Sequence, residues 1–179
     1  MFAKAVAVSL VLAAMTTPAL AERDNLQVFR DVERQVLRYP HFTIFDSVQA
    51  EVDGGVLTLT GKVTMPYKRT DIERRVATID GVQQVRNHID VLPVSQFDDE
   101  LRFLIARAIY TNPAFRGYGS MVNPPIHVIV ERGRVTLEGV VLSNVDRMIV
   151  RSIAGSFLAF EIRNELKTEA EVRQELERL

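Results

Sequence analysis

Two regions of the chain begin with apolar residues at helical spacing. Apolar side chains recur three or four positions apart from Leu26 to Leu37, and again from Leu101 to Ile109. This spacing places them along one side of a helix. Pro40 and Pro113 follow the two runs and mark where each helix ends. The predicted inner stripes are Leu26, Phe29, Val32, Val36 and Leu37 in the first helix, and Leu101, Leu104, Ile105, Ala108 and Ile109 in the second.

Two strands are predicted after each of these helices. Apolar and polar residues alternate from Val48 to Val52 and from Ile126 to Val130, which is the period of a half-buried strand. The returning strands run from Leu57 to Val63 in the first region and from Val135 to Val141 in the second. Both regions therefore contain a predicted hairpin directly after the opening helix.

A second helix and a last strand complete each region. Pro66 falls in the first turn of one helix, and Ser143 with Asp146 has the capping-box pattern in the other. The last strands alternate from Val85 to Val91 and from Ile162 to Leu166. The order helix, strand, strand, helix, strand predicts an α+β fold. We expect two tandem αββαβ two-layer sandwiches, each a three-stranded sheet with two helices on one face.

The two regions are copies of one unit of roughly 70 residues, a size that can fold alone. The segment YPHF matches NPAF, GGVLTLTG matches RGRVTLEG, and VRNHI matches IRNEL. We expect domains at residues 24–92 and 99–167, joined by a linker at 93–98. A charged helix at 168–179 is predicted to follow. Pro93 stiffens the short linker, so the domains are expected to lie side by side.

The first 21 residues have the pattern of a secretory signal peptide. Lys4 precedes an apolar run, Ala5–Ala14, and Ala19 and Ala21 form a small-residue cleavage site. We expect cleavage after Ala21, because a membrane-spanning helix needs roughly 20 apolar residues and this run is shorter. The pattern predicts a periplasmic protein, with secretion from the cell as the alternative.

Net charge and cysteine content limit the partners and the source of stability. The 179-residue chain has a formal net charge of -1 and contains no cysteine. A near-neutral chain is not expected to bind nucleic acid nonspecifically. Without cysteine there is neither a disulfide nor an acylated cysteine anchor, so stability must come from apolar burial.

The combination of a signal peptide, two copies and their strand motifs resembles the BON domain family, named for bacterial osmotically inducible and nodulation proteins. The glycine that ends each VLTLTG and VTLEG strand and the VRN and IRN strands carry the resemblance. It implies a non-enzymatic periplasmic or envelope protein associated with osmotic and envelope stress. It also implies domains that bind phospholipid surfaces or partner proteins.

The sequence contains no pattern that predicts catalysis. His41, His88 and His127 are scattered and lack the spacing of metal ligands. There is no thiol, no Gly-x-Ser-x-Gly elbow and no phosphate-binding loop. We therefore expect a protein that is not an enzyme and that uses neither a cofactor nor a metal ion.

Four glycines are predicted to serve the fold. Gly55 and Gly133 stand where a tight hairpin turn needs them. Gly61 and Gly139 fall on the inward side of their strands, where we expect a crossing helix to leave no room for a side chain. The alternative role for the second pair is close approach to a ligand.

The two copies differ on the outer side of their first helix. In the first copy that side is polar, whereas the second has aromatic residues beside an arginine. A longer loop, from Ala114 to Pro125, then adds further aromatic and apolar residues. Such side chains suit the membrane interface, and they suit a protein interface as well. The predicted lipid- or partner-binding residues are Phe103, Arg107, Tyr110, Phe115, Arg116, Tyr118 and Met121, with Ala106 on the same side of the helix.

Two interpretations of this face remain open at the level of sequence. It binds a partner, or it is internal and lies under the C-terminal helix or the other domain. Our first expectation is a protein that binds phospholipid headgroups or the membrane surface. The alternative is a protein-interaction or chaperone-like module that accepts a client on a free edge strand or an open sheet face. In the first copy the open face carries Gln49, Glu51, Thr58, Thr60 and Lys62.

Overall fold

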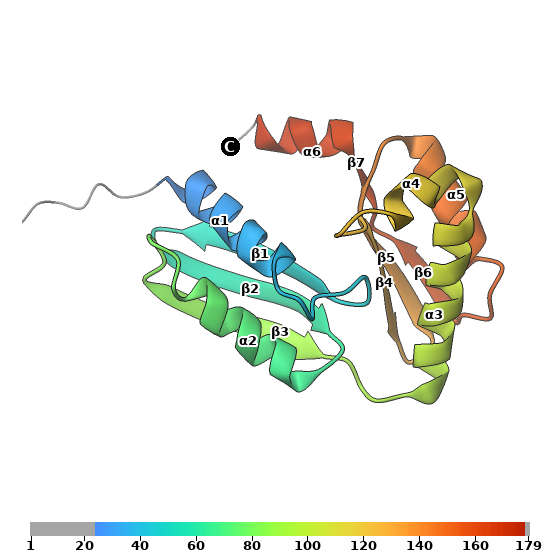
Figure 1. Ribbon diagram of the computed structural model, residues 1–179, viewed down its shortest axis with the longest axis horizontal. Coiled ribbons are helices and arrows are strands. Elements are labelled where there is room, and N and C mark those ends of the chain that lie inside the picture. Colours follow the sequence, from blue (N-terminus) through green and yellow to red (C-terminus); the bar gives the residue numbers. More distant parts are fainter. Residues whose placement is uncertain (1–23, 178–179) are drawn as a thin grey trace, which may run out of the picture.

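The chain folds into two α+β units, each with helices on one face of a small sheet (Figure 1). This computed structural model describes residues 24–177. The predicted signal peptide and its cleavage after Ala21 lie outside the described residues. The tandem αββαβ arrangement predicted from the sequence is confirmed, with further short elements added to the second unit.

The first unit has a mixed three-stranded sheet. Its elements are α1 (Asn25–Leu37), β1 (Ser47–Asp53), β2 (Val56–Val63), α2 (Pro66–Val76) and β3 (Gln84–Val91). Strand β2 pairs antiparallel with β1 and parallel with β3. Val28, Val32 and Val36 of α1 are buried against Leu57 and Leu59 of β2. Each such side chain contributes roughly 1.5–3 kcal/mol to stability when it leaves water.

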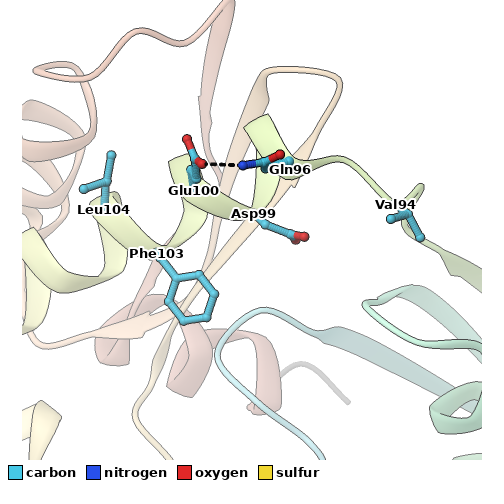
Figure 2. A pocket seen from close by; sticks show the side chains of 6 residues that line it. All are labelled: Val94, Gln96, Asp99, Glu100, Phe103 and Leu104. Atoms are coloured by element: carbon cyan, nitrogen blue, oxygen red, sulfur yellow. Dashed lines mark hydrogen bonds between the residues drawn. The ribbon is translucent and has the colours of Figure 1, made fainter.

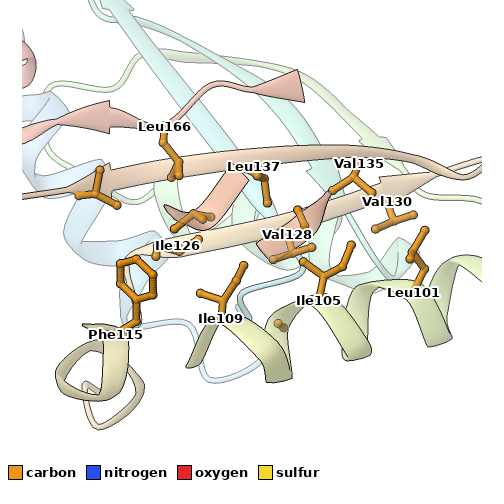
Figure 3. Packing of buried hydrophobic residues seen from close by; sticks show 14 residues of the cluster. Leu101, Ile105, Ile109, Phe115, Ile126, Val128, Val130, Val135, Leu137 and Leu166 are labelled. Carbon is orange, nitrogen blue, oxygen red and sulfur yellow. The ribbon is translucent and has the colours of Figure 1, made fainter. Parts of the chain in front are cut away.

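The second unit repeats this arrangement and extends it. Its elements are α3 (Gln96–Thr111), η1 (Pro113–Phe115), α4 (Arg116–Gly119), β4 (Ile126–Glu131), β5 (Arg134–Val141), α5 (Asn144–Ala154), β6 (Glu161–Asn164), β7 (Lys167–Thr168) and α6 (Glu169–Leu176). Leu101, Ile105 and Ile109 of α3 point toward the strands, as Figure 3 shows. Helices α3 and α5 pack side by side on this sheet.

The second sheet has four strands where three were expected. Strand β6 pairs with β5 only from Glu161 to Asn164. The chain then turns, with the Glu165 N–H donating to the Leu137 carbonyl at 2.8 Å, and pairs with β5 again as the two-residue strand β7. The interruption splits what is one long strand in the first unit into two short pieces.

Both hairpins use the backbone conformation that their glycines allow. The two central turn residues have positive φ in each hairpin: 51° and 78° at Gly54 and Gly55, and 52° and 73° at Arg132 and Gly133. Two consecutive positive φ angles are typical of a type I′ turn, whose twist matches that of the flanking strands.

The reason expected for Gly61 and Gly139 is wrong, although both positions do require glycine. No helix atom is among the nearest neighbours of a Cβ built at either residue. At Gly61 it would lie 2.2 Å from the Ser47 carbonyl oxygen, and at Gly139 it would lie 1.8 Å from that of Pro125. Both residues also have φ above +110°, which L side chains rarely adopt. The backbone that enters the preceding strand therefore excludes a side chain here.

An asparagine ties the last strand to the second helix in both units. Asn87 Nδ2 donates to the Arg69 carbonyl of α2 at 3.1 Å, and Asn164 Nδ2 donates to the Arg147 carbonyl of α5 at 2.9 Å. The predicted capping box of Ser143 and Asp146 is also confirmed at the start of α5. These shared contacts position helix on sheet in the same way in the two copies.

A turn of the first unit, residues 42–46, covers the edge of the second sheet. The Val128 N–H of β4 donates to the Ile44 carbonyl at 2.8 Å, and Ile44 and Phe45 pack against the core of the second unit. His127 Nδ1 lies 2.6 Å from the Asp46 carbonyl oxygen, which can only accept, so this nitrogen carries a proton. Because β4 is an edge strand, the turn blocks an edge that another chain could otherwise extend.

Asp46 holds that turn in place. Its carboxylate is fully buried and accepts bonds from the N–H groups of Thr43 and Thr64, both at 2.8 Å. Lys68 Nζ, itself almost fully buried, donates to the same carboxylate at 2.6 Å. Taking an ion pair out of water is costly, and here the bonds that the carboxylate accepts from both threonines and from Lys68 offset that cost.

Candidate functional site

Exposed apolar side chains are concentrated on the second unit. Within the described residues, the first unit exposes two large apolar residues, Met65 and Tyr67, and Val94 lies between the units. Isolated exposed apolar residues are normal, whereas a group of them indicates a binding surface. The second unit exposes Phe97, Phe103, Leu104, Met121, Val122, Leu142, Val145, Met148, Leu158 and Phe160.

The outer side of α3 differs from the one predicted. Phe103 is 62% exposed and Arg107 is exposed, as expected. Leu104, predicted to face inward, is 52% exposed, while Ala106, predicted to face outward, is 4% exposed. Because α3 carries apolar residues around most of its circumference, their spacing alone could not fix which side the sheet covers.

Tyr110 does not face outward, which corrects the prediction for this residue. Its hydroxyl donates to the Ile126 carbonyl at 2.6 Å and accepts from the Ile126 N–H at 3.1 Å. Burial raises the pKa of the Tyr110 phenol well above its ordinary value, so the hydroxyl stays protonated and able to donate. The residue fastens the end of α3 to the start of β4 and is not available to a ligand.

The loop after α3 is folded, so its predicted residues separate into two groups. Phe115 is 1% exposed and belongs to the core, and Tyr118 stacks on it with ring centroids 5.9 Å apart. Burial raises the pKa of Tyr118, whose hydroxyl accepts from the Leu142 N–H at 3.2 Å. Arg116 and Met121 remain exposed. Of the predicted binding residues, the structure leaves Phe103, Arg107, Arg116 and Met121 at the surface.

Helix α5 adds exposed residues that sequence reasoning missed. Val145 is 57% exposed and Met148 is 62% exposed, while Val150 and Ala154 are fully buried. Leu142, just before the helix, is 62% exposed. The signal was present in the sequence, because Val145 and Met148 are three residues apart and out of phase with the buried pair.

Phe103 borders a shallow pocket at the start of α3 and the end of the linker. Figure 2 shows Phe103 and Leu104 pointing away from the helix in different directions. The lining residues are Val94, Gln96, Asp99, Glu100, Phe103 and Leu104. Gln96 donates to Glu100 at 3.1 Å, and Asp99 pairs with Arg102 at 3.0 Å. With two carboxylates in its wall, the pocket is a poor match for an anionic ligand.

The other domain, and not the C-terminal helix, contacts Phe103. The rings of Phe45 and Phe103 meet edge to face, with centroids 4.8 Å apart. Helix α6 is held elsewhere, by Arg147 to Glu171 at 3.1 Å and Lys167 to Glu175 at 2.6 Å. The ring contact explains part of the burial of Phe103 but leaves most of its side chain exposed.

The open sheet face of the first unit partly serves the contact between the units. Lys62, on that face, donates to Glu131 of β4, and Ser47 at the start of β1 donates to Glu138 of β5. Glu51 and Thr60 remain exposed. A client on this face would therefore have to share it with the second unit.

Two further features were sought in the described residues: a cluster of metal ligands and a helix able to cross a membrane. No group of three or more His, Asp or Glu side chains gathers where it could hold a metal ion within residues 24–177. None of the helices in this part of the chain combines the length and apolar character needed to cross a membrane.

Comparison with solved structures gives distant likenesses. The C-terminal domain of CdsD, a structural protein of the type III secretion system of Chlamydia trachomatis, is 16% identical, with a TM-score of 0.33, and the match covers 87% of this chain and 71% of that one. A second CdsD structure is 13% identical, with a TM-score of 0.30, and covers 84% and 97% of the two chains. A comparison with curated proteins gives no match.

The sequence matches the model of one protein family twice. The BON domain model matches residues 27–93 and again residues 98–170. The first match spans the elements from α1 to β3, and the second spans those from α3 to the start of α6. Two matches that together cover most of the chain show that this protein belongs to the BON domain family and carries its domain in tandem.

Proposed function

We propose that this protein is a non-enzymatic binding protein of the bacterial envelope that associates with phospholipid membrane surfaces through its second unit. Membership of the BON domain family supports a role in binding at the envelope. The predicted signal peptide supports a location in the periplasm.

The observation that carries this proposal is the difference between the outer helical surfaces of the two units. On α1 and α2 the outer positions hold mostly polar and charged residues, such as Arg30, Glu33 and Arg74. On α3 and α5 the corresponding surface exposes Phe103, Met148 and further apolar side chains. Since both units have the same fold, the fold does not require this apolar surface, and a membrane interface provides a reason for it.

Co-sedimentation with vesicles tests the proposal. Residues 22–179 contain every described element and lack the apolar segment that would itself bind lipid. We expect binding to vesicles of anionic phospholipid and weaker binding to vesicles of neutral phospholipid. Higher salt should reduce the binding, because arginines near an anionic surface act through screened charge. An absence of binding to both vesicle types would overturn the proposal and direct the search to protein partners.

Salt dependence separates this function from the alternative of client binding. A client that adds a strand to a sheet edge is held by backbone hydrogen bonds and apolar pockets, which respond weakly to salt. The turn at residues 42–46 already occupies the β4 edge, so such a client would need another edge or a separated pair of units. Lipid-independent binding of an extended peptide, unchanged by salt, would favour the alternative.

A further inference from the structure

We propose that the second unit meets an anionic phospholipid membrane with one end, and not with the Phe103 side of α3. This inference rests on the proposed function and specifies the contact surface. We call this surface the end surface, because it lies mainly where α3 ends and α5 begins, and it extends along α5 to Arg151 in the last turn of that helix. It consists of the apolar residues Met121, Val122, Leu142, Val145 and Met148 and the arginines Arg107, Arg116 and Arg151.

The segments that form the end surface are held together by Tyr118. Its hydroxyl accepts from the Leu142 N–H at 3.2 Å, and its carbonyl accepts from the Met121 N–H at 3.1 Å. The ring stacks on buried Phe115. The loop carrying Met121 and Val122 is therefore anchored beside the β5–α5 junction, and Figure 1 shows α4 next to α5 at this end.

Helix α5 turns its apolar residues toward solvent at the same end. Val145 and Met148 occupy its first two turns, outward of buried Val150 and Ala154. Arg151, one turn after Met148, is also exposed. Arg107 lies in the last turns of α3, the part of that helix nearest the start of α5 because the two helices run in opposite directions (Figure 1).

Charge distinguishes the two ends of the second unit. Within the described residues Arg107, Arg116 and Arg151 are exposed and have no carboxylate partner. Of the carboxylates at this end, Asp146 is engaged in its capping box and Glu171 pairs with Arg147, whereas exposed Glu169 lies near Tyr118. The pocket beside Phe103 instead contains Asp99 and Glu100. An anionic surface is therefore attracted to the end surface and repelled from the start of α3.

The composition of the end surface fits a lipid layer better than a protein segment. The pocket at the start of α3 and the groove at Arg147, Asn164 and Glu171 are lined by residues outside this surface. Its apolar side chains come instead from a loop and from the first turns of a helix. Apolar residues interspersed with arginine are typical of protein segments that enter the headgroup region.

Site-specific labelling tests which surface enters the membrane. The chain contains no cysteine, so single cysteines can carry a polarity-sensitive fluorophore. Label positions are Val122 and Val145 on the end surface, Phe103 on the rival surface, and exposed Glu51 on the first unit. With anionic vesicles we expect a blue shift at Val122 and Val145 and none at Glu51. A shift at Phe103 without one at Val145 would overturn the inference.

Substitution provides a second and independent test. Val145→Ser with Met148→Ser should weaken vesicle binding about tenfold, whereas Phe103→Ser with Leu104→Ser should change it less than about twofold. Arg116→Gln with Arg151→Gln should weaken binding about tenfold at low salt and less at high salt. All these residues are exposed, so unfolding curves should remain close to those of the unchanged chain. The exception is Phe103→Ser, which also removes the ring contact with Phe45 and should lower stability slightly.

The outcomes separate the two proposals. If the unchanged chain binds no vesicle, the proposed function and this inference both fail. If it binds and the Val145→Ser, Met148→Ser variant binds equally well, the membrane function stands and the end surface is wrong.

Discussion

The two units of this protein share a framework but differ in what they place around it. Both have a type I′-like hairpin, a glycine that admits a backbone carbonyl, and an asparagine that ties strand to helix. The first unit uses the segment before β1 to form a turn fixed by Asp46 and Lys68, which contacts the second unit. The second unit uses the equivalent segment for η1 and α4, which support an exposed apolar surface. Shared positions therefore specify the fold, and divergent positions assign the roles.

Replacing a strand glycine should produce the largest effect and should do so in both units. We expect Gly139→Ala and Gly61→Ala each to cost about 3 kcal/mol or more, because each combines a carbonyl collision with a disfavoured φ. Denaturant unfolding followed by circular dichroism measures this cost. Gly117→Ala is the matched control, since a Cβ at Gly117 meets nothing within 4 Å. Equal stability of Gly139→Ala and Gly117→Ala would show that the backbone at Pro125 relaxes freely.

The ion pair at the third residue of the second helix should show the next largest effect, and it is present only in the first unit. This position is Lys68 in α2 and Asp146 in α5. Asp46→Ala leaves the buried Lys68 charge without its partner, so we expect a loss of about 3 kcal/mol of unfolding free energy. Asp146→Ala removes half of a capping box at a partly exposed site and should cost about 1 kcal/mol. Similar costs for the two variants would contradict the structural role assigned to Asp46.

The sequence predicted the fold well because period, turn residues and caps act locally. Each hairpin, the Pro66 start of α2 and the Ser143 capping box follow from neighbouring residues. The bond between Val128 and Ile44 joins positions far apart in the chain, and no local period encodes it. The predicted orientation of α3 was wrong for a related reason. Leu104 and Ala106 are both apolar, so only the position of the sheet decides which one is buried.

The candidate site was harder to predict than the fold. Aromatic residues were expected to bind ligands, but Phe115 belongs to the core of the second unit, and Tyr110 and Tyr118 pack against that core. In a small unit without disulfides, large rings are worth more in the core than at the surface. The exposed residues on α5 are aliphatic and were overlooked because they carry no distinctive chemistry.

The aromatic contact between the units should have a smaller effect. At the position equivalent to Phe103, the first unit has the charged outer side of α1. An aromatic ring at this position is therefore a feature of the second unit alone. A double-mutant cycle with Phe45→Ala and Phe103→Ala should give a coupling of about 1 kcal/mol, because the rings meet edge to face but one remains largely exposed. Leu104→Ala combined with Phe45→Ala is the control and should give additive costs. A coupling near zero for Phe45 and Phe103 would mean that the ring contact does not help to hold the units together.

The smallest effect expected is a pH dependence of the contact between the units, centred on His127. Burial lowers the pKa of His127 below its ordinary value. The Asp46 and Thr43 carbonyls and the carboxylates of Glu138 and Asp46 oppose this shift, which keeps the effect small. The folded protein thus binds fewer protons than the unfolded chain, so stability is complete above about pH 6.5 and falls as pH drops below it.

Gln49 is the first unit's counterpart of His127 on β1, which makes His127→Gln the matched variant. Unfolding curves between about pH 7.5 and about pH 5.5 should show a greater loss for the unchanged chain than for His127→Gln. Identical losses would indicate that protonated His127 is tolerated in place, with the units still joined through Ile44 and Val128.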